Sequence, residues 1–177
     1  KIQANARCLV RRLGARGLSV TGLTKAVCGH PDVAGAMLDG GVVGLADARI
    51  KNVVRMRMEG IKCPISMIRA PLVSEMEDVV RCCDASYNTE MDTILKLGAA
   101  AKQQGTSHGV ILMVEMGDMR EGILPENLND FATRVSATPG VALKGIAANF
   151  ACMGNVAPTA GDMDMLSRLA DQVEGAC

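Results

Sequence analysis

Short apolar segments alternate with amphipathic helical segments along the whole chain, and this alternation restricts the fold more than any other feature. Helical periodicity is found at residues 2–14, 31–40, 49–59, 74–83, 89–104, 125–136 and 162–173. Apolar stretches of strand length lie at residues 19–26, 42–48, 63–71, 84–88, 109–118 and 141–151. Strands this apolar, each followed by a helix, predict a parallel sheet whose outer side is covered by helices.

Polar side chains stand where these strands end, and they favour a barrel over a doubly wound sheet. The strand ends carry Lys25, Asp47, Arg69, Asn88, Asp118 and Asn149. In a (β/α)8 barrel this rim holds the catalytic groups. A dinucleotide-binding fold is disfavoured, because no G-x-G-x-x-G follows the first strand and no Walker loop occurs.

The predicted fold is therefore α/β, a (β/α)8 TIM-type barrel with about six of its eight βα units present. We expect residues 1–177 to form a single barrel domain. We also expect the last βα units, and a strand before the first helix, to lie outside this sequence, because six strands alone would leave two apolar edges open.

Composition excludes several classes of function. The formal net charge is +0, so no overall positive potential attracts nucleic acid. Only 2% of the residues are aromatic, which leaves few side chains on which bases could stack. No apolar run approaches the roughly 18 residues of a membrane span. The seven cysteines form no C-x-x-C pair, which argues against disulfides and a zinc site and predicts a cytoplasmic protein.

Lys25 is the most informative single residue, because a buried strand should hold only apolar side chains at this position. One explanation is a strand end that reaches solvent, with the ammonium extending outward. The other is a lysine walled in by Leu23 and Val27, partly desolvated so that its amine can attack an aldehyde. The spacing alone leaves both explanations open.

Three stretches of the sequence are informative when taken together: "TGLTKAVCGHPDVAGAMLDGGVVGLADARIKNV" (21–53), "LMVEMGDMREGILPENL" (112–128) and "GIAANFACMGN" (145–155). They resemble the fold-type III pyridoxal-phosphate enzymes, the family of the alanine racemase N-terminal barrel. Within that family the chain is most similar to single-domain ornithine-racemase-like amino-acid racemases. The resemblance runs from Lys1 to about Val173.

The resemblance implies pyridoxal 5'-phosphate as cofactor and an amino acid as small-molecule substrate. Lys25 would be the catalytic Schiff-base lysine, whose amine also moves the α-proton. Arg120 would approach the phenolic oxygen of the cofactor, the alternative being an exposed arginine paired with Glu121. Asn149 stands where many relatives carry a histidine beside the cofactor ring.

Further site residues follow from the same resemblance. Asp47 and Arg49 match a rim stretch that reads G-E-N-R in other branches, and would orient Lys25 or the substrate carboxylate, or form an ion pair with each other. The resemblance also places Asp47 among the residues expected to bind the cofactor. Arg69 would bind the substrate carboxylate, and Asn88 would line the substrate pocket. A homodimer is the expected assembly.

The remaining candidates are weaker. We expect His30 to be a loop or cap residue and His108 to lie at the surface. The second acid or base of a racemase has no clear candidate, because Tyr87 does not match the tyrosine of two-domain alanine racemases. A thiol at Cys28 or Cys152 is the alternative.

Three functions compete at this stage. The first is a pyridoxal-phosphate-dependent amino-acid racemase. The second is a non-catalytic pyridoxal-phosphate homeostasis or carrier protein of the same barrel, ranked lower because that branch shows G-E-N where this chain has Ala46-Asp47-Ala48. The third is a metal-dependent lyase that uses Glu115, Asp118 and Asp47, which leaves Lys25 unexplained.

Overall fold

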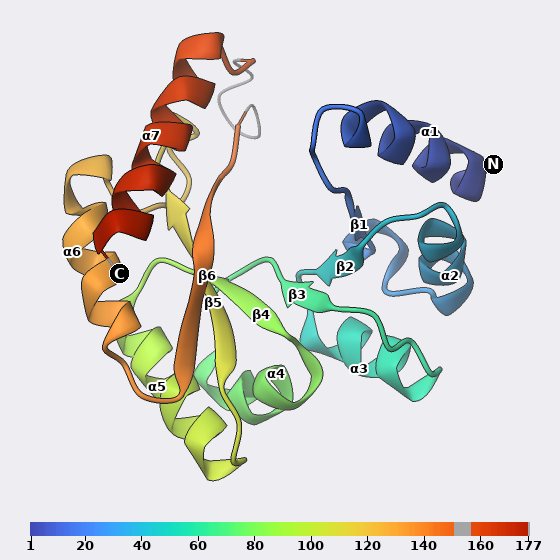
Figure 1. The fold of residues 1–177 in the computed structure, drawn as a ribbon. Helices are drawn as coiled ribbons and strands as arrows, with labels where there is room; N and C mark the ends of the chain where they lie inside the picture. The colour runs from blue at the N-terminus through green and yellow to red at the C-terminus, as the bar shows by residue number, and fades with distance from the viewer. Residues whose placement is uncertain (151–156, 177) are drawn as a thin grey trace. The chain divides into compact units, whose positions relative to one another are not determined.

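The structure is a computed structural model that describes residues 1–150 and 157–176. The described residues form two compact units, each with its own parallel strands and helices (Figure 1). Unit 1 comprises Lys1–Arg69 and Asp78–Asp84, and unit 2 comprises Ala70–Glu77 and Ala85–Cys177. The chain changes units after Arg69, after Glu77 and after Asp84. The second change lies within helix α4 (Met76–Cys82), which follows a 3-10 turn (Val73–Glu75).

Unit 1 is a three-stranded parallel sheet with its helices between the strands. Its elements are α1 (Ile2–Gly14), β1 (Thr21–Leu23), a 3-10 turn (Lys25–Val27), α2 (Pro31–Asp39), β2 (Gly44–Asp47), α3 (Ile50–Met58) and β3 (Ile65–Met67). The register pairs Leu23 with Ala46 and Asp47 with Met67. Helix α2 contacts β1 and helix α3 contacts β2, so one face of this sheet is covered by helices.

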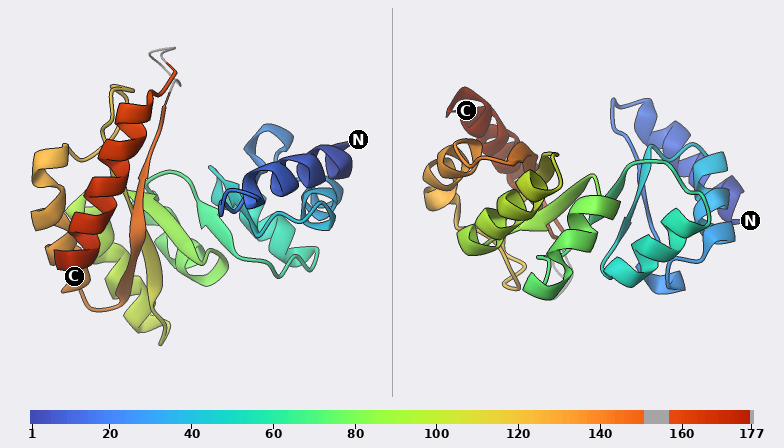
Figure 2. Two further views of the ribbon diagram at one scale, coloured as in Figure 1. Left: turned by 45° about the horizontal axis from the view of Figure 1, so that its top comes forward. Right: turned by 90° about the horizontal axis from the view of Figure 1, so that it is seen from below.

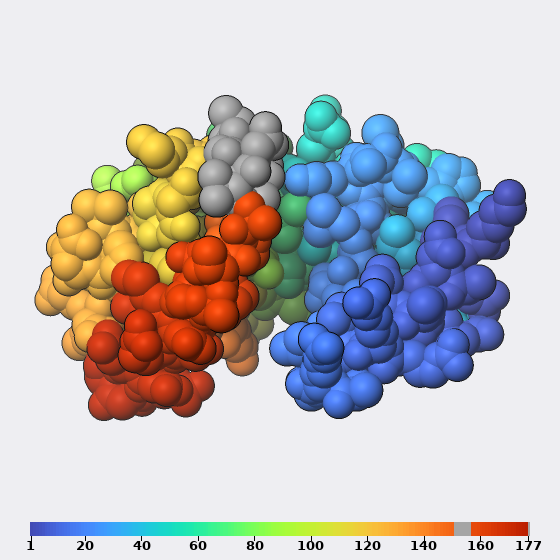
Figure 3. Space-filling view, turned by 90° about the horizontal axis from the view of Figure 1, so that it is seen from above, coloured from blue at the N-terminus to red at the C-terminus, as the bar shows by residue number. Residues whose placement is uncertain are grey.

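Unit 2 repeats the same plan with longer strands. Its elements are β4 (Ala85–Asn88), α5 (Met91–Gln103), β5 (His108–Val114), a 3-10 turn (Pro125–Asn127), α6 (Leu128–Ser136), β6 (Val141–Ala148) and α7 (Ala160–Ala176). The three strands are parallel, in the order β4-β5-β6. Helices α5, α6 and α7 pack against these strands, and α7 lies at the surface of the unit (Figures 2 and 3).

The core of unit 2 shows which sheet face the helices cover. Val110, Leu112 and Val114, which alternate along β5, are buried against apolar side chains of the helices. The helix residues of this cluster are Ile94, Leu128, Ala132, Val135, Leu169 and Val173. Because side chains alternate across a strand, Ile111 and Met113 point to the other face.

An arginine joins several segments of unit 1. Arg57, near the end of α3, donates its Nε to the carbonyl of Cys82 at 2.9 Å and pairs with the Asp84 carboxylate at 3.0 Å. Its Nη1 donates to the carbonyls of Ile61 and Cys63. The same Asp84 oxygen accepts the Ile65 N–H at 2.8 Å. One planar side chain thus ties the end of α3 to the start of β3 and the end of α4.

The predicted alternation is confirmed, but several strands are shorter than the apolar pattern suggests. The predicted strand 19–26 narrows to Thr21–Leu23, and 63–71 narrows to Ile65–Met67. The predicted end of the last strand, residue 151, lies outside the described residues. The helix at 2–14 begins and ends as predicted, and the helix predicted at 31–40 ends one residue earlier, at Asp39. The apolar stretches thus continue into the turns, beyond the residues whose backbones pair with a neighbouring strand.

Candidate functional site

Lys25 follows strand β1 and lies in a tight turn. Thr24 leaves the extended conformation at φ −103° and ψ −6°, and Lys25 begins the 3-10 turn. Cys28 and Gly29 then take positive φ values of 51° and 63°. We call residues 24–29 the Lys25 turn. The side chain of Lys25 is exposed, and no ion pair to it occurs among the residues that the structure describes.

The expected hydrocarbon wall around Lys25 is wrong for this structure. Leu23 is 44% exposed and Val27 is 38% exposed, so neither shields the amine from water. The physical reason is the short strand: β1 ends at Leu23, and the chain turns before a further pair of apolar side chains can flank the lysine. Lys25 is an accessible amine at the carboxyl end of a parallel strand.

Asp47, at the carboxyl end of β2, is fully buried and bonded within its own unit. Its Oδ2 accepts the Thr24 hydroxyl at 2.7 Å. Its Oδ1 accepts the Arg49 backbone N–H at 3.0 Å and the Asn52 amide Nδ2 at 2.9 Å. The register places Asp47 on the same sheet face as Leu45, the face that helix α3 covers.

These contacts change the expectations for Asp47 and for its neighbouring arginine. Of the options for the Asp47–Arg49 pair, the ion pair is wrong, because the carboxylate meets only the backbone of Arg49, whose side chain is exposed. Direct cofactor binding by Asp47 stays a prediction, since both its oxygens are occupied by this chain's own donors. Arg69, two residues past β3, is exposed and without an ion pair among the described side chains.

Arg120 lies in a loop that leaves β5 and returns to it. A parallel bridge pairs Val114 with Ile123, and the Glu115 N–H donates to the Ile123 carbonyl at 2.9 Å. Gly122 is required by this closure, because a Cβ there would lie 2.3 Å from the Glu115 nitrogen. The two ends of the loop are therefore fixed to one strand.

The interior of this loop is ordered by acidic side chains. The Glu115 Oε1 accepts the N–H groups of Gly117 and Met119, at 2.7 and 3.0 Å. Arg120 pairs with Glu121 at 3.2 Å, and its Nε lies 3.9 Å from the Asp118 carboxylate, which is buried. The pairing with Glu121 is the alternative that the sequence left open, and the cofactor role of Arg120 stays a prediction.

Asn88 ends β4 and belongs to a buried polar cluster of unit 2. Its Nδ2 donates to the Ser86 carbonyl and lies 3.0 Å from the Ser86 hydroxyl, which in turn lies 2.9 Å from His108 Nε2. The register pairs Ser86 with Val110, so this cluster shares the helix-covered face. Substrate binding by Asn88 stays a prediction, because the contacts found are within the chain.

The expectation of a surface position for His108 is wrong. His108 is 1% exposed. It is the first residue of β5, because the pairing of β5 with β6 begins at this position. His30 is the N-cap residue of α2, as expected. Tyr87 lies on the opposite face of β4 from Asn88, and burial raises its pKa above the ordinary value.

Asn149 directly follows β6 and is half-buried, which places it at a strand's carboxyl end as predicted. Cys152, the alternative second acid or base, lies outside the described residues. Cys28 is exposed within the Lys25 turn.

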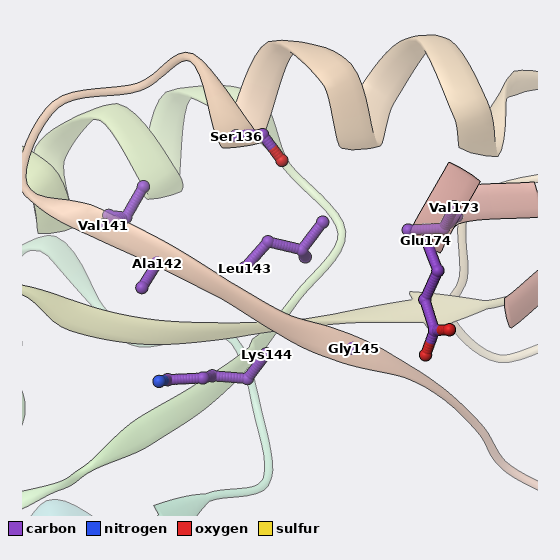
Figure 4. A pocket seen from close by; sticks show the side chains of 8 residues that line it. All are labelled: Ser136, Val141, Ala142, Leu143, Lys144, Gly145, Val173 and Glu174. Atoms are coloured by element: carbon purple, nitrogen blue, oxygen red, sulfur yellow. The ribbon is translucent and has the colours of Figure 1, made fainter. Parts of the chain in front are cut away.

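Two cavities are found away from these residues. One of about 470 Å³ lies along β6, between Leu143 and helix α7, with Lys144 and Glu174 at its margin (Figure 4). Another of about 340 Å³ lies in unit 1 beside Leu9, Val20 and Met37. Neither is lined by a predicted site residue.

The described part of the chain lacks a metal-binding cluster and a membrane-spanning helix. No group of three or more His, Cys, Asp or Glu residues there could hold a metal ion, so the lyase alternative lacks a donor set in those residues. No helix there is long and apolar enough to cross a membrane.

The structure divides most of the predicted residues between the two units. In unit 1, Thr24 links the Lys25 turn to Asp47, which also accepts the Arg49 backbone N–H. In unit 2, Asn88 ends β4, whereas Arg120 and Asn149 follow β5 and β6. The sequence analysis did not single out Thr24 and Asn52, which bind the Asp47 carboxylate. The sequence shows only that Thr24 is next to Lys25 and that Asn52 is five residues after Asp47. Parallel strands with helices between them, and polar groups at the strand ends, are typical of the (β/α)8-barrel class.

Comparison with known proteins identifies the family within this class. The chain matches the family "Alanine racemase, N-terminal domain" over residues 1–177, and it therefore belongs to that family. It is 29% identical to the lysine racemase of Thermotoga maritima and 31% identical to the ornithine racemase of Acetoanaerobium sticklandii, over 98% of this chain in both cases. It spans 48% and 49% of these two proteins, about half their length.

A solved structure confirms the fold. The alanine racemase of Streptomyces coelicolor A3(2) superposes with a TM-score of 0.83 at 20% sequence identity, over 98% of this chain and 48% of that one. The fold prediction, an α/β chain of the TIM-barrel type found in the alanine racemase N-terminal domain, is confirmed.

Proposed function

We propose that this chain is part of a pyridoxal-phosphate-dependent amino-acid racemase that acts on a basic amino acid such as ornithine or lysine. One observation carries this proposal: the exposed amine of Lys25 lies at the carboxyl end of β1 in a chain about 30% identical to an ornithine and a lysine racemase. The curated relatives named above are racemases, which favours racemisation over the cofactor-carrier alternative.

The residues present fit an aldehyde cofactor. An accessible primary amine without a carboxylate partner among the described residues is free to attack a carbonyl carbon. The Arg120 guanidinium carries the positive charge that would favour an anionic oxygen on the cofactor ring. Pyridoxal phosphate, when bound, supplies an electron sink that makes the substrate's α-proton removable.

The chain's own residues then have distinct tasks. Lys25 would hold the cofactor until the substrate's amine replaces it, and the released Nζ would then take or give the α-proton on its own face of the amino acid. Asn149 would donate or accept a hydrogen bond beside the ring, and Arg69, Arg49 and Asn88 remain candidates for the substrate. Racemisation at one carbon requires a proton donor on the opposite face, a role for which Cys28 is our candidate within the described residues.

The test uses the full-length protein with added cofactor. α-Proton exchange of L-ornithine, L-lysine and L-alanine in D2O is measured by NMR, and the Lys25→Ala variant should lose exchange by about 10³-fold or more. Lys62→Ala, which removes another exposed lysine, is the matched control and should retain it. Cofactor binding at Lys25 without exchange of any amino acid would overturn the racemase and favour the carrier.

Two broader assignments accompany this proposal. The cytoplasm is the proposed compartment, supported by the free thiols of Cys8, Cys28, Cys63, Cys82 and Cys83. A homodimer is the proposed assembly, to be checked by sedimentation of the full-length protein.

A further inference from the structure

The buried carboxylate of Asp47 has no cationic partner among the residues that the structure describes. Taking a carboxylate out of water is costly unless hydrogen bonds replace its solvation. Three donors do so here, at 2.7, 2.9 and 3.0 Å. An apolar side chain such as that of Leu45 on the same face would avoid the cost, so the value of Asp47 lies in what its bonds hold together.

One oxygen holds the start and the end of the Lys25 turn through Thr24. Thr24 is fully buried, and its N–H donates to the Ala46 carbonyl at 2.9 Å while its hydroxyl donates to Asp47. The Thr24 carbonyl in turn accepts the N–H groups of Val27 and Gly29, at 3.0 and 3.2 Å. The backbone on both sides of Lys25 is therefore held by hydrogen bonds to Thr24.

The other oxygen holds the helix against which the turn packs. Asp47 Oδ1 accepts from Arg49 and Asn52 at the start of α3. Gly29 lies directly on Asn52, because a Cβ on Gly29 would be 2.8 Å from both the Asn52 Cβ and its carbonyl oxygen. The Lys25 turn is thus clamped at Thr24 and at Gly29, and Asp47 connects the two contacts.

We infer that Asp47 is a positioning residue for Lys25, acting through Thr24 and Asn52 rather than by touching the cofactor. This inference rests on the proposed function, in which Lys25 is the cofactor lysine. An exposed lysine has no packing of its own to fix its direction, so the clamp determines where its Cα and side chain begin. Loss of the clamp should reduce the selectivity of Lys25 for the aldehyde without changing other lysines.

The experiment measures this selectivity directly. The full-length protein is incubated with pyridoxal phosphate, the adduct is reduced with sodium cyanoborohydride, and peptide mass spectrometry gives the labelling ratio of Lys25 to Lys62. Thr24→Val removes the hydroxyl that binds Asp47 and should lower the ratio about tenfold. Thr24→Ser keeps the hydroxyl and should restore it. Thr133→Val removes an exposed hydroxyl in α6 and is the matched control.

The outcomes separate the inference from the proposed function. A wild-type protein without preference for Lys25 would overturn the proposed function itself. A wild-type preference that persists in folded Thr24→Val would overturn only the clamp. If Thr24→Val does not fold, Asn52→Ala carries the same test, because it removes the amide donor but keeps the Cβ and carbonyl that Gly29 contacts. An unchanged ratio in that variant would also overturn the clamp.

Discussion

The position of Gly122 has no room for a side chain. A Cβ there would lie 2.3 Å from the Glu115 nitrogen and 2.6 Å from its Cα, so Gly122→Ala must push the Arg120 loop away from β5. We expect a loss of about 1–3 kcal/mol in the free energy of unfolding, measured by urea denaturation. Gly35→Ala, in helix α2 with open space around it, is the control and should stabilise slightly.

His108 offers a second prediction at the residue scale. Replacing it with Phe removes the nitrogen that lies 2.9 Å from the buried Ser86 hydroxyl. The free energy of unfolding should fall by about 1–3 kcal/mol, because the buried Ser86 hydroxyl loses one of its two hydrogen-bond partners. His30→Phe changes an exposed residue and should have little effect. Equal, small effects of the two substitutions would contradict the buried cluster.

Some residues of the candidate site could be picked out from the sequence, but their contacts could not. Lys25 is conspicuous because its charge interrupts an apolar stretch. Thr24 and Asn52 are not, because their partner Asp47 is 23 and 5 positions away in the sequence and only the sheet register brings them together. Hydrogen bonds between strands and helices are set by that register, which hydrophobic periodicity does not report.

Arg57 joins three elements, so its replacement tests the scale of the element. Arg57→Lys keeps the charge but loses the planar fork that reaches the carbonyls of Ile61, Cys63 and Cys82 together. We expect a loss of about 1–3 kcal/mol in the free energy of unfolding, read from chemical denaturation. Arg12→Lys, an exposed residue of α1, is the matched control. A loss of similar size in both variants would show that the fork contributes nothing.

Element order and type could be predicted from periodicity, whereas strand ends could not. The amphipathic pattern of α1 and α2 carries its own boundaries, such as Pro31 at the first turn of α2. Strand ends depend on where the neighbouring strand stops pairing. β1 pairs only through Leu23, so Lys25 enters a turn although the apolar pattern continues to Val27.

At the scale of the whole molecule, buried thiols predict a loss of stability in alkali. Burial raises the pKa of Cys83 from 9.0 to about 12, and desolvation also raises that of Cys63. Above pH 9 the unfolded chain therefore loses protons that the folded chain keeps, so the free energy of unfolding falls as pH rises. The expected slope is about 1.4 kcal/mol per pH unit for one such thiol.

Thermal denaturation between pH 8 and about pH 11 checks this slope, with Cys83→Ala as the comparison. The variant loses packing at every pH but should show a flatter decline, because one raised thiol has been removed. A parallel decline in the two proteins would assign the alkaline sensitivity to other groups.

The fold class of the whole chain could be predicted because every strand–helix pair points to the same architecture. The arrangement of its site could not, since Asp47 and Asn88 end strands on the face that helices cover, whereas a count of polar strand ends treats all of them alike. The face that a side chain takes follows from alternation along the strand, so Asp47 shares the face of Leu45 and Asn88 shares the face of Ser86.

The closure of the Arg120 loop on β5 has a consequence for how this protein can vary. Because Val114 and Ile123 bridge at the base, insertions or exchanges between residues 116 and 121 would alter the reach of the arginine while the register of β5 and β6 stays intact. Sequence changes within this loop can therefore alter the contacts of Arg120 while the strand pairing of the sheet is kept.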